Sequence, residues 1–276
     1  MSKIRTFLPF APWVGIILFF VLIAIFAPLL APYSPDTQNL LGRLKVPGTT
    51  ARNVFYLLGS DELGRDLFSR IIYGARVSLA VAFASTILSG VLGTFLGLYA
   101  AYRRSWVETL IMRLVDIFLS VPAILLAIIT VAVLGTGMIN VVLVLALTRW
   151  PRYARVAYGQ TLGLMNMPYV RLARFMGASS GRVMLKHLLP NIIGPIIVVA
   201  TLEFGLMVLF EAGLSFLGLG VQPPTASWGA MLSTGRNYVA TAWWIACFPG
   251  FCLFLLVLAV NLTGDRLKAW LDPKSR

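Results

Sequence analysis

The sequence predicts an all-α, polytopic membrane protein with six transmembrane helices and both termini in the cytoplasm. Of its 276 residues, 59% are hydrophobic and 12% are charged, and the mean hydropathy is +0.86. Several apolar runs reach the roughly 20 residues that cross about 30 Å of hydrocarbon. The runs are continuously apolar and do not alternate with polar residues, so helices fit them better than the strands of a closed barrel.

The first apolar run follows Lys3 and Arg5, as in a signal peptide. It is longer than a usual signal core and no small-x-small cleavage site follows it, so we expect a retained span. The second run contains Gly93 and Gly97, a spacing that allows close helix packing. The six predicted spans are 10–31, 77–101, 110–134, 138–157, 191–213 and 241–263.

Orientation follows from the positions of Lys and Arg. With the N-terminus inside, sixteen of these residues fall in inside segments and seven in outside segments. Positive residues favour the cytoplasmic side, so both termini and the basic loop at about 158–190 are expected there. The same effect explains the net charge of +13 better than nucleic-acid binding does.

The outside segment between the first two spans has two parts. Residues 32–58 contain several Pro and Gly and predict an extended connector. Residues 59–76 predict a helix that Ser60 caps. Its apolar stripe would either lie on the outer leaflet or dock an external partner. The stripe consists of Leu63, Leu67, Ile71 and Ala75.

Enzymatic motifs are missing from the sequence. It contains no GxxxxGK[ST] phosphate loop, no HExxH and no GxSxG. The one histidine, His187, cannot build a histidine metal site, and Cys247 and Cys252 both lie in the last apolar run. We therefore expect no catalytic residue, no metal site and no cofactor held by this chain.

The stretch YVRLARFMGASSGRVMLKHLLP, residues 169–190, is basic and carries no acid. It predicts a short helix that stops at Gly177, and a second helix from Arg182 that ends at Pro190. A merely solvated loop and a contact surface for a soluble partner both fit this composition.

The same stretch resembles the EAA motif of permease subunits in binding-protein-dependent ABC importers. Ala173, Gly177, Leu189 and Pro190 match that motif in spacing. Arg171 replaces its Glu, Leu172 an Ala and His187 an Ile. Further stretches resemble the C-type permease of dipeptide, oligopeptide or nickel importers, so the resemblance covers nearly the whole chain. These stretches are 58–79, 112–128, 214–232 and 261–274.

The resemblance implies a non-catalytic permease in the bacterial inner membrane. It implies a heterodimer with a second permease, two ATPase subunits that bind ATP and Mg, and an extracytoplasmic binding protein. Residues 1–76 would hold the first span and the outside segment, and 77–276 a five-helix permease core. The ATPase contact would include Arg171, Leu172, Ala173, Gly177, Ala178, His187 and Pro190.

Arg171 departs from the motif by placing a cation where the family has a carboxylate. We expect Arg171→Glu to weaken ATPase docking, because the partner groove should complement a cation. Co-purification of the ATPase and its stimulated activity are the measurements. Unchanged values of both would refute the expectation.

Several charged and aromatic residues in or beside the predicted spans are candidates for a function. Glu203 and Glu211, with Met207 between them on the fifth span, either line a translocation path or pack helices as protonated or paired groups. Arg113 and Asp116 are expected to pair within one helix. A docking site for the binding protein would involve Arg65, Asp66 and Trp228, although Trp228 also suits an interfacial anchor.

Peptides are the substrate that the resemblance favours, and nickel or another small solute is the alternative. An ion-coupled carrier with Glu203 as its relay is a second class of function. An intramembrane hydrolase is disfavoured, because it needs a nucleophile paired with a base and the only histidine, His187, lies in the cytoplasmic loop.

Overall fold

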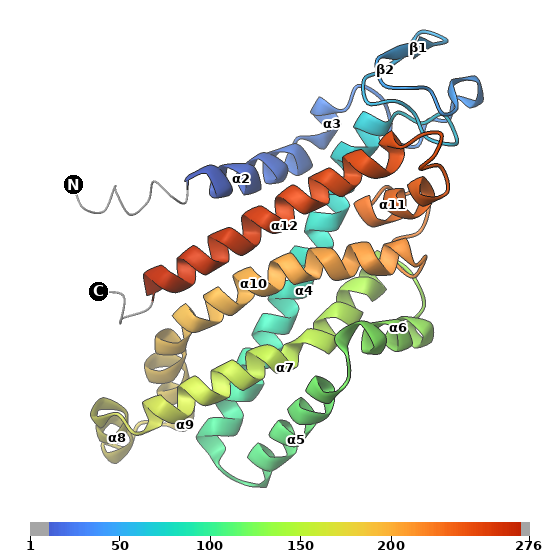
Figure 1. Ribbon diagram of the computed structural model, residues 1–276. Coiled ribbons are helices and arrows are strands. Elements are labelled where there is room, and N and C mark those ends of the chain that lie inside the picture. Colours follow the sequence, from blue (N-terminus) through green and yellow to red (C-terminus); the bar gives the residue numbers. More distant parts are fainter. Residues whose placement is uncertain (1–10, 272–276) are drawn as a thin grey trace, which may run out of the picture.

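Helices make up most of the chain in the computed structural model, which describes residues 11–271 (Figure 1). Four of them are long: α4 (Leu67–Arg103), α7 (Met138–Met165), α10 (Leu189–Phe216) and α12 (Trp244–Leu271). The shorter helices are α2 (Ala11–Ile25), α3 (Ala27–Leu30), α5 (Trp106–Ser120), α6 (Ala123–Leu134), α8 (Pro168–Phe175), α9 (Ser180–Arg182) and α11 (Trp228–Arg236). The basic residues Lys3, Arg5, Lys274 and Arg276 lie outside the described residues.

A small hairpin departs from the all-α expectation. Strands β1 (Thr49–Ala51) and β2 (Val54–Tyr56) pair antiparallel at one end of the bundle (Figure 1). Arg52 and Asn53 join them with φ values of +47° and +63°, the left-handed geometry of a two-residue hairpin turn. A 3₁₀ turn, η1 (Leu40–Gly42), precedes the hairpin. The segment 32–58 is therefore folded and is not the extended connector that its prolines and glycines suggest.

Helix α4 starts later than the sequence predicts and then continues without a break. Gly64 has φ +71°, which no helix accommodates, so the chain before it forms a turn. Asp66 caps α4 by accepting a hydrogen bond from the Ser69 amide at 2.8 Å. The hydroxyl of Ser60 accepts a bond from the Lys45 amide instead. The separate helix expected over 59–76 and the span expected from 77 are thus one helix.

The apolar stripe at the start of α4 faces the protein. Leu67, Ile71 and Ala75 are buried in the main hydrophobic core, together with Trp228 and Met231. The expected helix on the outer leaflet is therefore wrong. Helices α11 and α2 pack over the stripe. They cover the side of α4 that would face lipid if the helix were isolated.

The third predicted span, 110–134, is broken. Helices α5 and α6 meet at a bend of 99°. Pro122 lies between them and provides the N-cap position of α6. A proline restricts the residue before it to extended geometry, and Val121 has φ −96° and ψ 134°. The helix must therefore end at this point and restart in a new direction.

Among residues 11–271, three helical runs are long and apolar enough to cross a membrane: α4, Ser180–Phe216 and α12. The α5–α6 pair passes the same test as one broken span, which makes four. Helix α2 is apolar but has 15 residues. Helix α7 is long enough, but its arginines interrupt the apolar run. The six-span count stays a prediction.

Helix α7 extends to Met165, beyond the predicted end at 157. Arg149, Arg152 and Arg155 consequently lie within the helix, and they were counted among the cytoplasmic charges. Without them the remaining Lys and Arg still number thirteen in inside segments against seven in outside segments, so the positive charge still favours cytoplasmic termini.

The second half of the basic loop is continuous with α10. Residues Val183–Leu188 form a π-helical turn, η2, between α9 and α10. The predicted helix end at Pro190 is wrong, because Pro190 lies in the first turn of α10. A proline is tolerated where its missing N–H would have no regular α-helical partner, and the wider turn before it provides that position.

Close packing of α4 against α7 forms the centre of the bundle. A Cβ atom on Gly93 would lie 2.2 Å from the Trp150 carbonyl oxygen. A Cβ atom on Gly97 would lie 2.2 Å from the carbonyl oxygen of Ala154. The close helix contact that the glycine spacing predicts is therefore confirmed.

We expect Gly97→Ala to destabilise the bundle by about 1–3 kcal/mol, because the added methyl group meets backbone that cannot rotate away. Gly90→Ala on the same helix is the matched control. Its Cβ would lie 3.4 Å from the Tyr153 ring, so we expect little loss or a small gain from helix propensity. Thermal unfolding in detergent measures both, and equal unfolding temperatures would refute the packing argument.

Candidate functional site

The basic loop folds into a short helix that stands out from the bundle. Helix α8 ends at Phe175, and Gly177 follows with φ +79°, a conformation that glycine adopts without strain. The amide of Gly177 donates to the Arg174 carbonyl and the amide of Ala178 to the Ala173 carbonyl, both at 3.0 Å. These bonds close the helix end and form a rigid tip. Helix α8 lies at the end of the bundle opposite the hairpin (Figure 1).

The tip of α8 exposes large apolar side chains. Phe175 is 90% exposed, Met176 77% and Leu172 59%. On the other side of the helix, Val170 is fully buried in a second core cluster with Leu188. One face of α8 is therefore anchored, and the other presents an apolar surface without a partner among the described residues.

The predicted ATPase-contact residues fall in two places. Arg171, Leu172, Ala173, Gly177 and Ala178 lie on α8 or in the turn after it. Arg171 is exposed, and its Nη2 donates to Asn166 Oδ1 at 3.4 Å. His187 and Pro190 lie beyond α9, on η2 and at the start of α10. Phe175 and Met176 were not among the predicted contact residues, although two apolar residues beside a stop glycine in a basic loop are a recognisable signal.

A buried ion pair connects α7 and α10. Glu203 is 1% exposed and accepts from Arg149 twice, from Nε at 2.7 Å and from Nη2 at 2.9 Å. The Arg149 guanidinium also lies over the Phe210 ring, 5.1 Å from its centroid. Such two-point pairing neutralises both buried charges and also fixes the distance between α7 and α10.

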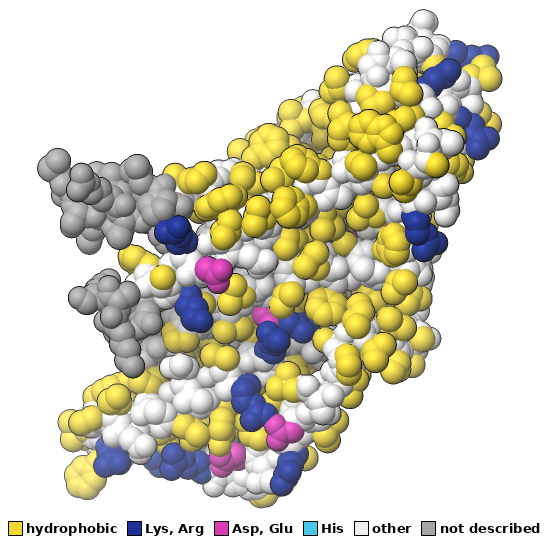
Figure 2. All heavy atoms as spheres, in the orientation of Figure 1, with side chains coloured by type: hydrophobic (Ala, Val, Ile, Leu, Met, Phe, Trp, Pro, Cys, Tyr) yellow, Lys and Arg dark blue, Asp and Glu magenta, His cyan; other side chains and the backbone are white. Residues whose placement is uncertain are grey.

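The exposed arginines of α7 lie beside this pair. Arg152 Nη1 lies 3.3 Å from Glu203 Oε1, and the Arg152 side chain is 55% exposed. Arg155 pairs with Asp116 on α5. The predicted pair within α5, between Arg113 and Asp116, is therefore replaced by a pair between helices. Figure 2 shows basic and acidic side chains crossing the middle of a face that is otherwise largely hydrophobic.

Glu211 lies farther along α10 and has hydroxyl partners. Its carboxyl oxygens accept from Ser78 Oγ on α4 and Ser215 Oγ on α10, both at 2.8 Å. Glu211 and Met207 are both fully buried. In this arrangement Glu203, Met207 and Glu211 contact neighbouring helices.

The residues expected to dock a binding protein are buried in this structure. Arg65 is 7% exposed, Asp66 3% and Trp228 0%. The Trp228 indole donates to the Ile71 carbonyl at 3.0 Å and contacts the Phe20 ring edge-on. Trp228 is thus an internal packing residue and not an interfacial anchor. A docking surface at this end would have to be formed by exposed neighbours of these side chains.

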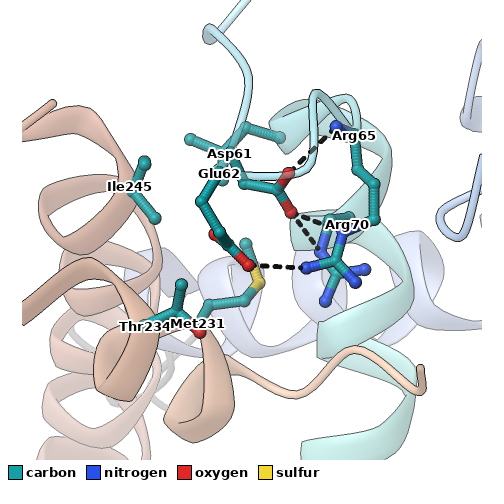
Figure 3. A pocket seen from close by; sticks show the side chains of 8 residues that line it. Asp61, Glu62, Arg65, Arg70, Met231, Thr234 and Ile245 are labelled. Atoms are coloured by element: carbon teal, nitrogen blue, oxygen red, sulfur yellow. Dashed lines mark hydrogen bonds and ion pairs between the residues drawn. The ribbon is translucent and has the colours of Figure 1, made fainter. Parts of the chain in front are cut away.

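Arg65 belongs to a compact charged cluster at the start of α4 (Figure 3). Its Nε donates to Asp61 Oδ2 at 2.6 Å and its Nη2 to Glu62 Oε1 at 3.1 Å. Arg70 lies 3.5 Å from the same Asp61 oxygen. The other oxygen of Glu62 is buried without a hydrogen-bond partner. Burial and the neighbouring Asp61 charge raise the pKa of Glu62, and burial raises the pKa of Asp66.

We expect the turn at 59–66 to be more stable at pH 5 than at pH 7. Because the folded-state pKa of Glu62 lies above its ordinary value of 4.5, the folded form holds the proton more tightly than the unfolded form. The stabilisation that the Glu62 carboxyl contributes is therefore complete below about pH 4.5, and it is lost as the pH rises through the raised pKa of Glu62. Hydrogen exchange of these amides, corrected for intrinsic rates, measures the difference.

Glu62→Gln should flatten this pH dependence, whereas amides in the middle of α12 should show none of it. Faster corrected exchange of the 59–66 amides at pH 5 than at pH 7 would contradict the sign of the effect.

The part of the chain that the structure describes contains no group of three His, Cys, Asp or Glu residues that could hold a metal ion. Cys247 and Cys252 are free thiols. The charged clusters described above consist of Arg paired with carboxylates, an arrangement that holds elements of the fold together.

Comparison with known families matches residues 93–276 to the binding-protein-dependent transport system inner membrane component family. Residues 14–47 match the N-terminal transmembrane domain of oligopeptide transport permease C.

Individual relatives agree with these matches. A di/tripeptide transport system permease of Pseudomonas aeruginosa is 46% identical, covering 94% of this chain and 87% of the relative. A glutathione transport system permease of Pectobacterium atrosepticum is 42% identical, covering 94% of this chain and 84% of the relative. A solved inward-facing methionine ABC transporter shares the fold, with a TM-score of 0.59 and 21% identity over 74% of this chain and 97% of the solved chain.

Proposed function

Because the chain belongs to the family of binding-protein-dependent transport system inner membrane components, it is a permease subunit of an ABC importer, and we propose that it carries di- and tripeptides. As a permease subunit it is not itself catalytic. The observation that carries the substrate assignment is the 46% identity to a di/tripeptide permease over 94% of the chain. The glutathione permease supports it, since glutathione is itself a tripeptide.

Membership of the family places this chain in the inner membrane and implies partner ATPase and permease subunits. We propose two ATPase subunits, which bind ATP and Mg, one related second permease and an extracytoplasmic binding protein that delivers the peptide. The solute then crosses by alternating access between the paired permeases, with no covalent step on this chain.

We propose six spans, formed by α2–α3, α4, α5–α6, α7, α10 and α12, with both termini cytoplasmic. Packing of α7 against α4 and α10 supports its inclusion despite its arginines. The excess of Lys and Arg on the side of α8 supports the orientation.

The proposed ATPase contact is the tip of α8. Exposed apolar side chains beside Arg171 and Arg174 suit a groove in a soluble partner, because interface cores are typically apolar with arginine nearby. The Gly177 turn and the buried Val170 make the tip rigid, so that a push on α8 passes to α7 and, through η2, to α10.

Uptake into proteoliposomes that contain the complete transporter tests the substrate. We expect ATP-dependent uptake of a labelled dipeptide that unlabelled di- and tripeptides compete away and free amino acids do not. Radioactive nickel in place of the peptide is the control. Nickel uptake that excess dipeptide does not inhibit, with no peptide uptake, would assign the alternative substrate.

A further inference from the structure

Helix α7 exposes ionic groups near its midpoint. The side chain of Arg152 is 55% exposed, that of Arg155 46%, and that of their neighbour Asp116 54%. An arginine at the centre of a bilayer costs about 2.5–3.5 kcal/mol on insertion scales, so such a face is unsuited to lipid. If α7 spans the membrane, as proposed above, this face borders water or protein.

The charges on this face do not balance. Arg149 donates hydrogen bonds to both oxygens of Glu203, and Arg155 forms an ion pair with Asp116. Arg152 has only a 3.3 Å contact with Glu203 Oε1, an oxygen that already accepts from Arg149 at 2.9 Å. Three guanidinium groups therefore face two carboxylates. Arg113 and Glu108, which line a hollow on α5 together with Asp116, add one charge of each sign. Among the three arginines of α7, Arg152 is the one that is both exposed and weakly held.

We propose that Arg152 binds the carboxylate of the transported peptide as it passes this face, an inference that rests on the proposed function. A guanidinium presents a planar fork that matches a carboxylate in two hydrogen bonds, and most of the Arg152 side chain is open to such a ligand. Every unmodified peptide ends in a carboxylate, so one cation suits a carrier of peptides that differ in sequence.

The Glu203 contact gives the site a way to release its ligand. A transport site must bind strongly enough for entry and weakly enough for exit. Glu203 competes for the Arg152 guanidinium at 3.3 Å, so the peptide carboxylate is exchanged for an internal one when it leaves. No such exchange is available to Arg149, which is buried and doubly paired.

The test compares a tripeptide with its C-terminal amide in proteoliposomes containing the complete transporter. Arg152→Gln should raise KM for the free acid about tenfold and leave KM for the amide unchanged, relative to wild type in each case. Arg152→Lys, which keeps the charge, should recover much of the loss. Arg155→Gln, the same substitution three residues along α7, should affect both peptides alike. If uptake of the amide is slow, equilibrium dialysis against the solubilised complex measures the preference for the free acid over the amide directly.

An equal effect of Arg152→Gln on the acid and the amide, or none on either, would overturn the proposal. Loss of the second permease from Arg152→Gln preparations would also overturn it, since Arg152 would then pair with an acid of that subunit. Absence of ATP-driven peptide uptake by the wild type would instead reject the proposed function, and this inference with it.

Discussion

Replacing Glu203 with glutamine is expected to lower the free energy of unfolding by about 3–5 kcal/mol, because it leaves the buried Arg149 guanidinium without its counter-charge. For a chain of this size that corresponds to a fall of about 6–20 °C in unfolding temperature. Glutamine preserves the size of the side chain and one acceptor oxygen, so the loss reports the charge. Thermal unfolding in detergent and the yield of assembled transporter are the measurements.

Two variants make this result specific. Arg152→Gln removes only the partly exposed 3.3 Å contact with Glu203 and should cost at most about 1 kcal/mol. Replacing Arg149 and Glu203 together by methionine should recover most of the stability, since no unpaired charge remains buried. If Glu203→Gln unfolds at the wild-type temperature, the pair does not hold α7 against α10.

Phe175→Ala is expected to weaken ATPase docking about 30-fold or more. The Phe175 side chain is 90% exposed at the tip of α8, and large aromatic anchors at protein interfaces contribute about 2 kcal/mol or more when truncated. The fold should be unaffected, because the ring contacts no core cluster among the described residues. Retention of the ATPase during purification and peptide-stimulated ATP hydrolysis are the measurements.

Leu185→Ala provides the control for Phe175→Ala. Leu185 is 52% exposed on η2 and lies outside the tip. Its truncation should leave both measurements near the wild-type values. Full retention and stimulation in Phe175→Ala would place the ATPase contact elsewhere.

Local signals in the sequence predicted two local features, the end of the helix in the basic loop and the close packing of α4. Gly177 follows a basic helical stretch and was expected to stop it, and it does so with φ +79°. The spacing of Gly93 and Gly97 predicted a close helix contact, which the structure places against α7. Both signals depend on the backbone within a few residues, or on the absence of a side chain.

Features that depend on how helices face one another were not predictable. Glu203 and Arg149 are 54 positions apart, and nothing in either run indicates that α7 and α10 would bring them together. Asp116 pairs with Arg155 on α7 and not with the nearer Arg113 for the same reason. The start of α4 was misplaced because Ser60 and Asp66 are both good caps, and the turn at Gly64 decides between them.

The exposure of Phe175 was not predictable for a different reason. Apolar residues in a helical pattern are normally assigned to a core, and a contact surface for a partner reverses that rule. Only the structure shows that Val170 faces inward while Phe175 and Met176 face outward.

The energy source for uptake tests the central claim most directly. The complete transporter is placed in proteoliposomes with ATP on the side of the ATPase subunits. The binding protein and labelled dipeptide are added on the opposite side. We expect the peptide to accumulate on the side of the ATPase subunits. Accumulation should persist when an ionophore collapses the proton gradient and stop when a non-hydrolysable analogue replaces ATP. Accumulation driven by a proton gradient without ATP, abolished by Glu203→Gln in correctly assembled transporter, would contradict the account and identify an ion-coupled carrier.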